Sequence, residues 1–123
     1  MKRCTFPIRC VLTAALLVAA PHSPAAELAG NAEVRRVEID IRAGETTGSD
    51  VVRVTQDDRV ELVWSSDEPL ELHLHGYDIE LRVPAGKPAV MSVHAHATGR
   101  FPVTRHGEGG AHHTVLYLEV HPD

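Results

Sequence analysis

Hydrophobic and polar positions alternate along most of the chain from residue 34 onward. Val37, Ile39 and Ile41 alternate with Glu38 and Asp40 at the start of this region. Successive side chains of a strand point to opposite faces, so a period of two predicts half-buried β-strands. We expect further strands within residues 52–55, 60–64, 70–75, 79–83, 89–96, 100–104 and 114–120.

Turn-forming residues separate these alternating runs every eight to twelve residues. They occupy 43–50, 56–59, 65–69, 84–88 and a Gly/His loop at 105–113. Seven or eight short, regularly spaced strands without a helical stretch are typical of a β-sandwich or Greek-key barrel. The sequence therefore predicts one all-β domain over residues 34–123, preceded by a flexible segment at 26–33.

The N-terminus has the pattern of a cleavable signal peptide over residues 1–25. A basic start is followed by ten apolar residues, 11–20, which is about half the length of a membrane-spanning helix. Cleavage after Ala25 places Ser23 and Ala25 at the two positions that require small side chains. Cuts after Ala26 or near Ala20 are the alternative cleavage sites, and an uncleaved anchor or a misread start is the alternative to a signal peptide. We expect a periplasmic or secreted protein with no stable membrane insertion after cleavage, and no lipid anchor.

Removing this leader changes the chemistry of the chain. Both cysteines, Cys4 and Cys10, leave with it, while eight of the nine histidines remain. Three of the 12 Lys and Arg are lost but none of the 17 Asp and Glu, so the net charge falls from −5 to −8. An acidic surface argues against nucleic acid as a partner and suits cations.

Seven of the eight remaining histidines fall in three clusters that are candidates for metal binding, and His121 stands apart. His73 and His75 are two residues apart on an expected strand, so both point away from the neighbouring leucines. Two imidazoles on one face can bind a divalent ion if a third ligand comes from a neighbouring strand or loop. The simpler interpretation is a pair of solvated surface histidines.

The Gly/His loop supplies the second cluster, His106, His112 and His113, with Glu108 as a secondary candidate ligand. Glycines allow the backbone to wrap closely around an ion, although a mobile surface loop would have the same composition.

His94 and His96 repeat the spacing of the first pair and are also secondary candidates. If their strand neighboured that of His73, four imidazoles would share one face. Otherwise they belong to a polar outer surface.

No enzyme motif is present in the sequence. It contains no nucleophile elbow, phosphate-binding loop or H-E-x-x-H helix. We therefore expect a protein that is not an enzyme.

The order of segments resembles the cupredoxin-like family, in particular its small single-domain periplasmic type. The resemblance covers Val34 to His121. It rests on 51–62 (with Asp57 where glycine is usual), 73–78 (HLHGYD), 84–88, 99–101 and 116–120.

In family members with type 1 copper, the resemblance implies one early histidine, here His73 or His75, and a cysteine near Arg105. That cysteine is absent, and the loop has no methionine. A blue copper electron carrier is not expected, because the thiolate is the defining ligand. The residues that remain are His73 or His75 with His106, and His112 or His113.

Two functions are compatible with this pattern. The first is an exported cupredoxin-like protein that binds copper, or second to it zinc, through histidines as a carrier, chaperone or buffer. The alternative is a metal-free cupredoxin-like interaction module of a periplasmic system. Its partner would be a periplasmic or membrane transport protein.

Overall fold

The computed structural model describes residues 33–123. The predicted signal peptide, and all but the last residue of the predicted flexible segment, lie outside these residues. The nine strands of the described part are β1 (Val34–Arg42), β2 (Glu45–Thr46), β3 (Val51–Thr55), β4 (Arg59–Ser66), β5 (Leu70–Leu74), β6 (Ile79–Val83), β7 (Ala89–His94), β8 (Gly99–His106) and β9 (His112–His121).

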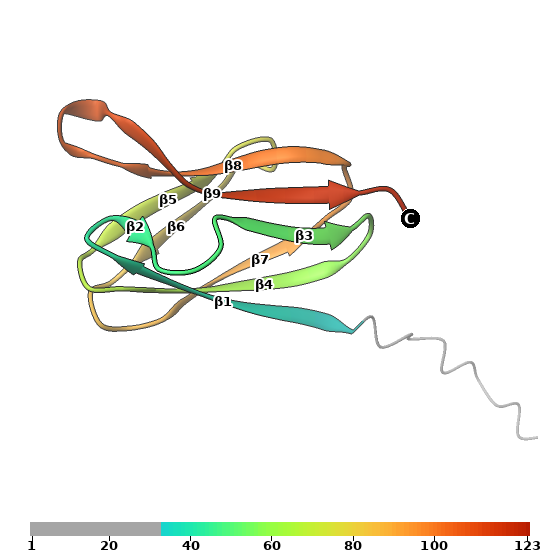
Figure 1. The fold of residues 1–123 in the computed structure, drawn as a ribbon, viewed down its shortest axis with the longest axis horizontal. Coiled ribbons are helices and arrows are strands. Elements are labelled where there is room, and N and C mark those ends of the chain that lie inside the picture. Colours follow the sequence, from blue (N-terminus) through green and yellow to red (C-terminus); the bar gives the residue numbers. More distant parts are fainter. Residues whose placement is uncertain (1–32) are drawn as a thin grey trace, which may run out of the picture. The chain divides into compact units, whose positions relative to one another are not determined.

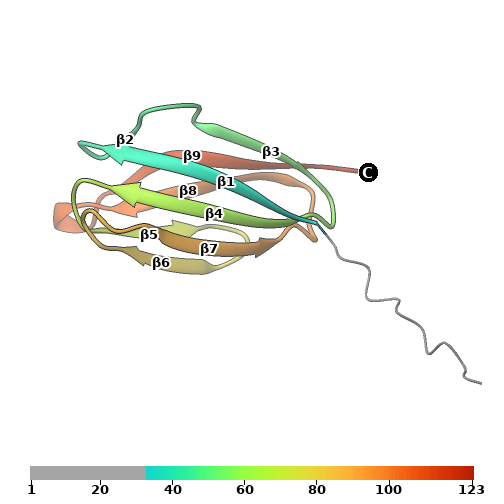
Figure 2. The same cartoon turned by 90° about the horizontal axis from the view of Figure 1, so that it is seen from below.

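These strands form two packed sheets (Figures 1 and 2). One sheet has four strands in the order β2-β1-β4-β7, and the other has five in the order β3-β9-β8-β5-β6. β1 pairs with β4 and β3 pairs with β9 in parallel, whereas the other pairings are antiparallel. In Figure 1 the β8–β9 hairpin extends beyond one end of the sandwich, opposite to the C-terminus.

The core lies between the inner faces of the two sheets. Trp64 and Leu62 of β4 are fully buried, as are Leu74 of β5 and Leu118 of β9. These are the apolar positions of the alternating runs, so the period of two correctly separates inner from outer side chains. The all-β sandwich predicted from the sequence is confirmed.

The strand boundaries differ from the prediction at β2 and at the β8–β9 hairpin. The two-residue strand β2 forms inside the predicted turn 43–50, which raises the strand count to nine. The predicted loop 105–113 is mostly a hairpin, with strand to His106, a short 3₁₀ turn at Glu108–Gly110 and strand again from His112. The alternating pattern does not reveal this extension, because histidines on both strands make both faces of the hairpin polar, as in a loop.

The strands that carry the two H-x-H pairs do not neighbour each other. β5 belongs to the five-stranded sheet and β7 to the four-stranded sheet. The condition for four imidazoles on one face is therefore not met. Both strands also end earlier than predicted, so that His75 and His96 lie just beyond them.

Within residues 33–123, no helix has the length and hydropathy needed to cross a bilayer.

Candidate metal-binding face

The outer face of the five-stranded sheet brings charged and imidazole side chains into rows. Glu71 of β5 is paired with Arg82 of β6, and His106 of β8 is paired with His112 of β9. The β5–β8 register, with Leu72 opposite Arg105, continues to place Glu71 opposite His106. The first row across four strands is therefore Arg82, Glu71, His106 and His112.

A second row lies one step along the same face. His73 is paired with Glu80 on one side and with Thr104 on the other. Because Thr104 precedes His106 by two residues, His73 is the diagonal neighbour of His106. Such neighbours are about 7–8 Å apart between their Cα atoms.

His106 and His112 form the closest histidine pair across two strands of this sheet. Their ring centroids are 4.7 Å apart, with the ring planes at 72°. Metal–imidazole bonds are about 2.0 Å long, so rings at this separation can reach one ion. A β-bulge between Val103 and Thr104 contributes to this arrangement, because it shifts the β8–β9 register by one residue.

The turn of this hairpin depends on glycine. The Gly107 amide donates a hydrogen bond to the Ala111 carbonyl at 2.8 Å, closing the loop. Gly109 and Gly110 have φ of 75° and 79°, a region that other residues rarely adopt. The side chain of Glu108, a secondary candidate ligand, lies outside the described part of the structure.

His73 has a partner that suits a metal ligand. Its Nε2 is 3.0 Å from Oδ1 of Asp78, which accepts a hydrogen bond from the imidazole. This contact leaves Nδ1 of His73 as the nitrogen with a free lone pair. Metal-binding histidines commonly donate their second ring nitrogen to a carboxylate in this way.

His75 lies further from the hairpin than His73. Its amide donates to the Pro102 carbonyl, and its Nε2 hydrogen-bonds to the Thr104 hydroxyl at 2.9 Å. The rings of His73 and His75 are 4.1 Å apart. Of the two alternatives left open by the sequence, the register places His73 nearer to His106.

His113 lies on the opposite face of the hairpin from His106 and His112. It is paired with Arg105, and its ring approaches Gly107. The choice between His112 and His113 is therefore a choice between two faces, and only His112 shares a face with His73.

Arg105 stands where the resemblance places the cysteine of a type 1 copper site. Its guanidinium packs against Gly44, and its Nε is buried without a hydrogen-bond partner among the described residues. A half-buried guanidinium in this position repels a metal ion, and the chain from residue 33 onward has no cysteine. These residues do not fit a type 1 copper centre.

Glu71, together with Arg82, was not recognised in the sequence. Both line a recess of about 280 Å³ together with Glu80 and His106. The hydrogen bond and positive charge of Arg82 hold the pKa of the Glu71 carboxyl below its usual range, and His106 acts in the same direction. Only the strand register reveals this contact, because Glu71 reads as an ordinary polar position of an alternating strand.

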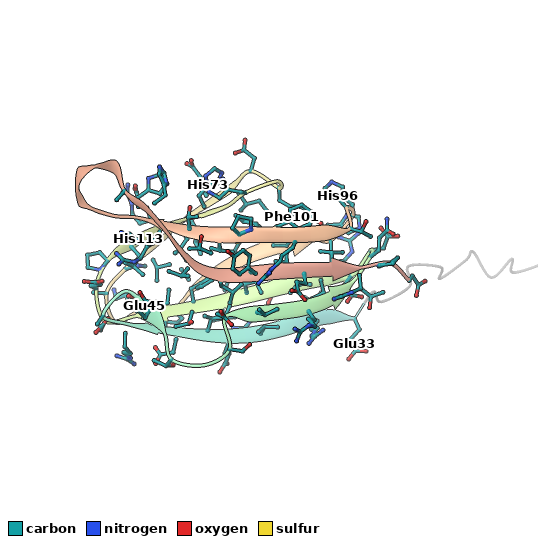
Figure 3. All side chains as sticks on the ribbon, turned by 45° about the horizontal axis from the view of Figure 1, so that its top comes forward. Glu33, Glu45, His73, His96, Phe101 and His113 are labelled. Carbon is teal, nitrogen blue, oxygen red and sulfur yellow. The ribbon has the colours of Figure 1, made fainter. Side chains whose placement is uncertain are left out.

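The His94/His96 pair has different surroundings. His94 is opposite Arg59 on β4, and its Nε2 is 3.7 Å from Oδ1 of Asp57. The His96 ring lies edge-on to Tyr77, and its Nδ1 donates to the His94 carbonyl. Figure 3 places His96 near the end of the sandwich away from the hairpin.

In the described part of the chain, no three His, Cys, Asp or Glu side chains are already arranged to hold a metal ion. The outer face of the five-stranded sheet thus presents a histidine pair with further ligands within one row, and not a complete coordination sphere.

Comparison with known proteins identifies the architecture. No family model and no curated protein match the sequence. Among solved structures, a copper binding protein in its apo form has a TM-score of 0.59 at 11% identity, covering 71% of this chain and 87% of its own. The fold is cupredoxin-like.

Two further structures agree with this fold. The periplasmic domain of cytochrome oxidase subunit II (CoxB) of Bradyrhizobium japonicum has a TM-score of 0.57 at 11% identity, covering 72% of this chain and 85% of that domain. A blue copper oxidase from Nitrosomonas europaea has a TM-score of 0.61 at 16% identity, covering 74% of this chain. This chain spans only 40% of that oxidase.

Proposed function

We propose that this protein is an exported copper-binding protein whose histidines hold the ion on the outer face of the five-stranded sheet. It serves as a carrier, chaperone or buffer, with zinc as the second choice of metal, and not as an enzyme or a blue copper electron carrier. The observation that supports this most is the His106–His112 pair at 4.7 Å, with His73 diagonal to it on the same face.

The chemistry of this donor set favours copper over harder cations. Imidazole nitrogens bind Cu(II) and Zn(II) well, whereas Mg²⁺ and Ca²⁺ prefer oxygen ligands. An incomplete, partly exposed set of ligands suits an ion that must be taken up and released. The acidic net charge of −8 after loss of residues 1–25 also favours the approach of cations.

The kinds of protein that share the fold give further support. One solved neighbour is described as a copper binding protein and another as a blue copper oxidase. The likeness to the periplasmic domain of CoxB is consistent with a location outside the cytoplasm, as the predicted signal peptide also suggests.

The test is a calorimetric titration of the full chain with Cu(II) and Zn(II). Cys4 and Cys10 are first changed to Ser, because thiols in the predicted leader would compete for the ion. We expect a Cu(II) dissociation constant of about 1 μM or lower. Binding no tighter than roughly 1 mM, or tight binding that persists in the triple variant His73→Ala, His106→Ala and His112→Ala, contradicts the proposal.

The second candidate function is the metal-free interaction module. It is favoured by the lack of a complete ligand set in the described residues. An ion that binds only the folded state must raise the melting temperature, whereas a metal-free module melts at the same temperature with copper or with chelator.

A further inference from the structure

The row that contains the histidine pair also contains a carboxylate with a replaceable partner. Glu71 lies opposite His106 by the continued β5–β8 register, and both residues line the same recess of about 280 Å³. Glu71 is therefore placed to supply an oxygen ligand to an ion held by His106 and His112. In its observed position, however, the carboxylate accepts a hydrogen bond from the Arg82 guanidinium.

The Glu71–Arg82 ion pair is easily exchanged. The side chains of Glu71 and Arg82 are 54% and 79% exposed. Ion pairs with this exposure contribute little to stability, because water solvates both partners well when they separate. A divalent ion attracts the carboxylate more strongly than a single guanidinium charge does at a similar distance.

Resting on the copper site proposed above, we propose that Glu71 is a ligand of that site and that Arg82 competes with the ion for this carboxylate. When the ion binds to His106 and His112, Glu71 leaves Arg82 and turns to the metal. Arg82 is then left beside Glu80, two residues away on the same face of β6, or in solvent.

In this arrangement Arg82 lowers the affinity of the site for copper. The guanidinium occupies the carboxylate before the ion arrives, and its positive charge opposes the ion afterwards. A carrier or buffer benefits from such a restraint, because an ion that is held less tightly is released more readily to a partner.

The four-stranded sheet offers a matched control. Arg36 and Glu61 form an exposed cross-strand ion pair at 2.9 Å between β1 and β4. Changing either of them to Gln removes the same charge as the corresponding change at Arg82 or Glu71, but on the other sheet.

The experiment measures Cu(II) affinity, in competition with a chelator, for the chain that carries Ser at positions 4 and 10. In this background, Glu71→Gln is expected to lower the affinity roughly tenfold, as loss of one ligand from a partial set would. Arg82→Gln is expected to raise it about three- to tenfold, because a competing cation is removed. Glu61→Gln and Arg36→Gln should each change it by less than about twofold, since both charges lie on the other sheet and salt screens exposed charges.

Two additional readouts separate ligation from a general charge effect. Glu71→Gln should change the Cu(II) electron paramagnetic resonance spectrum, because a neutral water or amide oxygen replaces an anionic carboxylate, whereas Glu61→Gln should leave the spectrum unchanged. The gain from Arg82→Gln should be clearly smaller in the Glu71→Gln background than in the parent chain, because no carboxylate remains to be released.

Copper binding that is equally tight in the parent and in Glu71→Gln, with identical spectra, overturns the role of Glu71 while the proposed function stands. An equal gain from Arg82→Gln in both backgrounds overturns the competition. If the parent and all variants bind no copper, the proposed function fails and this inference fails with it.

Discussion

Two histidine pairs with the same H-x-H spacing have different neighbouring strands in this sandwich. His73 on β5 is the diagonal neighbour of His106, and its Nε2 donates a hydrogen bond to the Asp78 carboxylate. His94 on β7 also has a carboxylate nearby, Asp57 at 3.7 Å, but it is opposite Arg59 on β4, a strand without histidine.

The difference shows that an H-x-H motif on a strand does not by itself indicate a metal site. The strand next to the motif decides whether further metal ligands lie nearby. That strand comes from a distant part of the sequence. On the five-stranded sheet β8 and then β9 bring one imidazole each, and on the four-stranded sheet β4 brings an arginine and no imidazole.

Removal of the hairpin histidines should cause the largest difference in copper affinity between variants of the two histidine groups. The double variant His106→Ala and His112→Ala is expected to lose copper affinity by on the order of 100-fold or more, because both central ligands are gone. The matched double variant His94→Ala and His96→Ala should change it by less than about threefold. Calorimetric titration of both proteins measures this, and equal losses would contradict the distinction between the two pairs.

Acidification should have the next largest effect. Imidazole ordinarily titrates between about pH 5 and 8, and the protonated ring cannot bind a metal. Lowering the pH from about 7.5 to 5.5 should weaken copper binding by up to about tenfold for each imidazole ligand. A chelator-competition assay across this range tests the sign, and affinity that rises on acidification would exclude imidazole ligands.

Single substitutions should separate His73 from His75. His73→Ala is expected to lower copper affinity roughly tenfold, because this ring lies diagonal to His106. His75→Ala should lower it less than about threefold, since its Nε2 is engaged with Thr104. The reverse ranking, measured by the same competition assay, would place the ion one row further from the hairpin.

Asp57→Gly should have the smallest effect and should act on stability alone. Asp57 has a φ of 70°, which glycine adopts without steric cost. We expect the free energy of unfolding in urea to rise by about 0.5–1 kcal/mol. Copper affinity should not change, although Asp57 is near His94. A drop in affinity would show that the far pair also takes part.

The sequence predicts the strands well, because a half-buried strand requires apolar and polar residues to alternate along the chain. Ile39 and Ile41, for example, are both buried in the core, as their alternation with Glu38 and Asp40 predicts. It predicts the hairpin poorly, because His106 and His112 are polar whether they lie in a loop or on a strand. Local pattern also cannot reveal that β5 and β7 belong to different sheets.

The candidate site was predictable only as a set of residue types. His73, His106 and His112 stand out by their chemistry, but their common face depends on the β8–β9 register and its bulge. Glu71 and Arg82 were missed because charged residues on an outer strand face are ordinary. Their proposed role depends on the strand pairing, which places Glu71 beside β8 on one side and opposite Arg82 on the other.

The most direct test of the central claim is to locate the ion by its paramagnetism. Sub-stoichiometric Cu(II) is added to the isotope-labelled protein, and the broadening of each backbone amide signal is followed by nuclear magnetic resonance. Signals of Glu71, His73, His106 and His112 are expected to broaden first, while those of His94 and His96 remain sharp. Selective broadening around His94 and His96, or none at all, would contradict it.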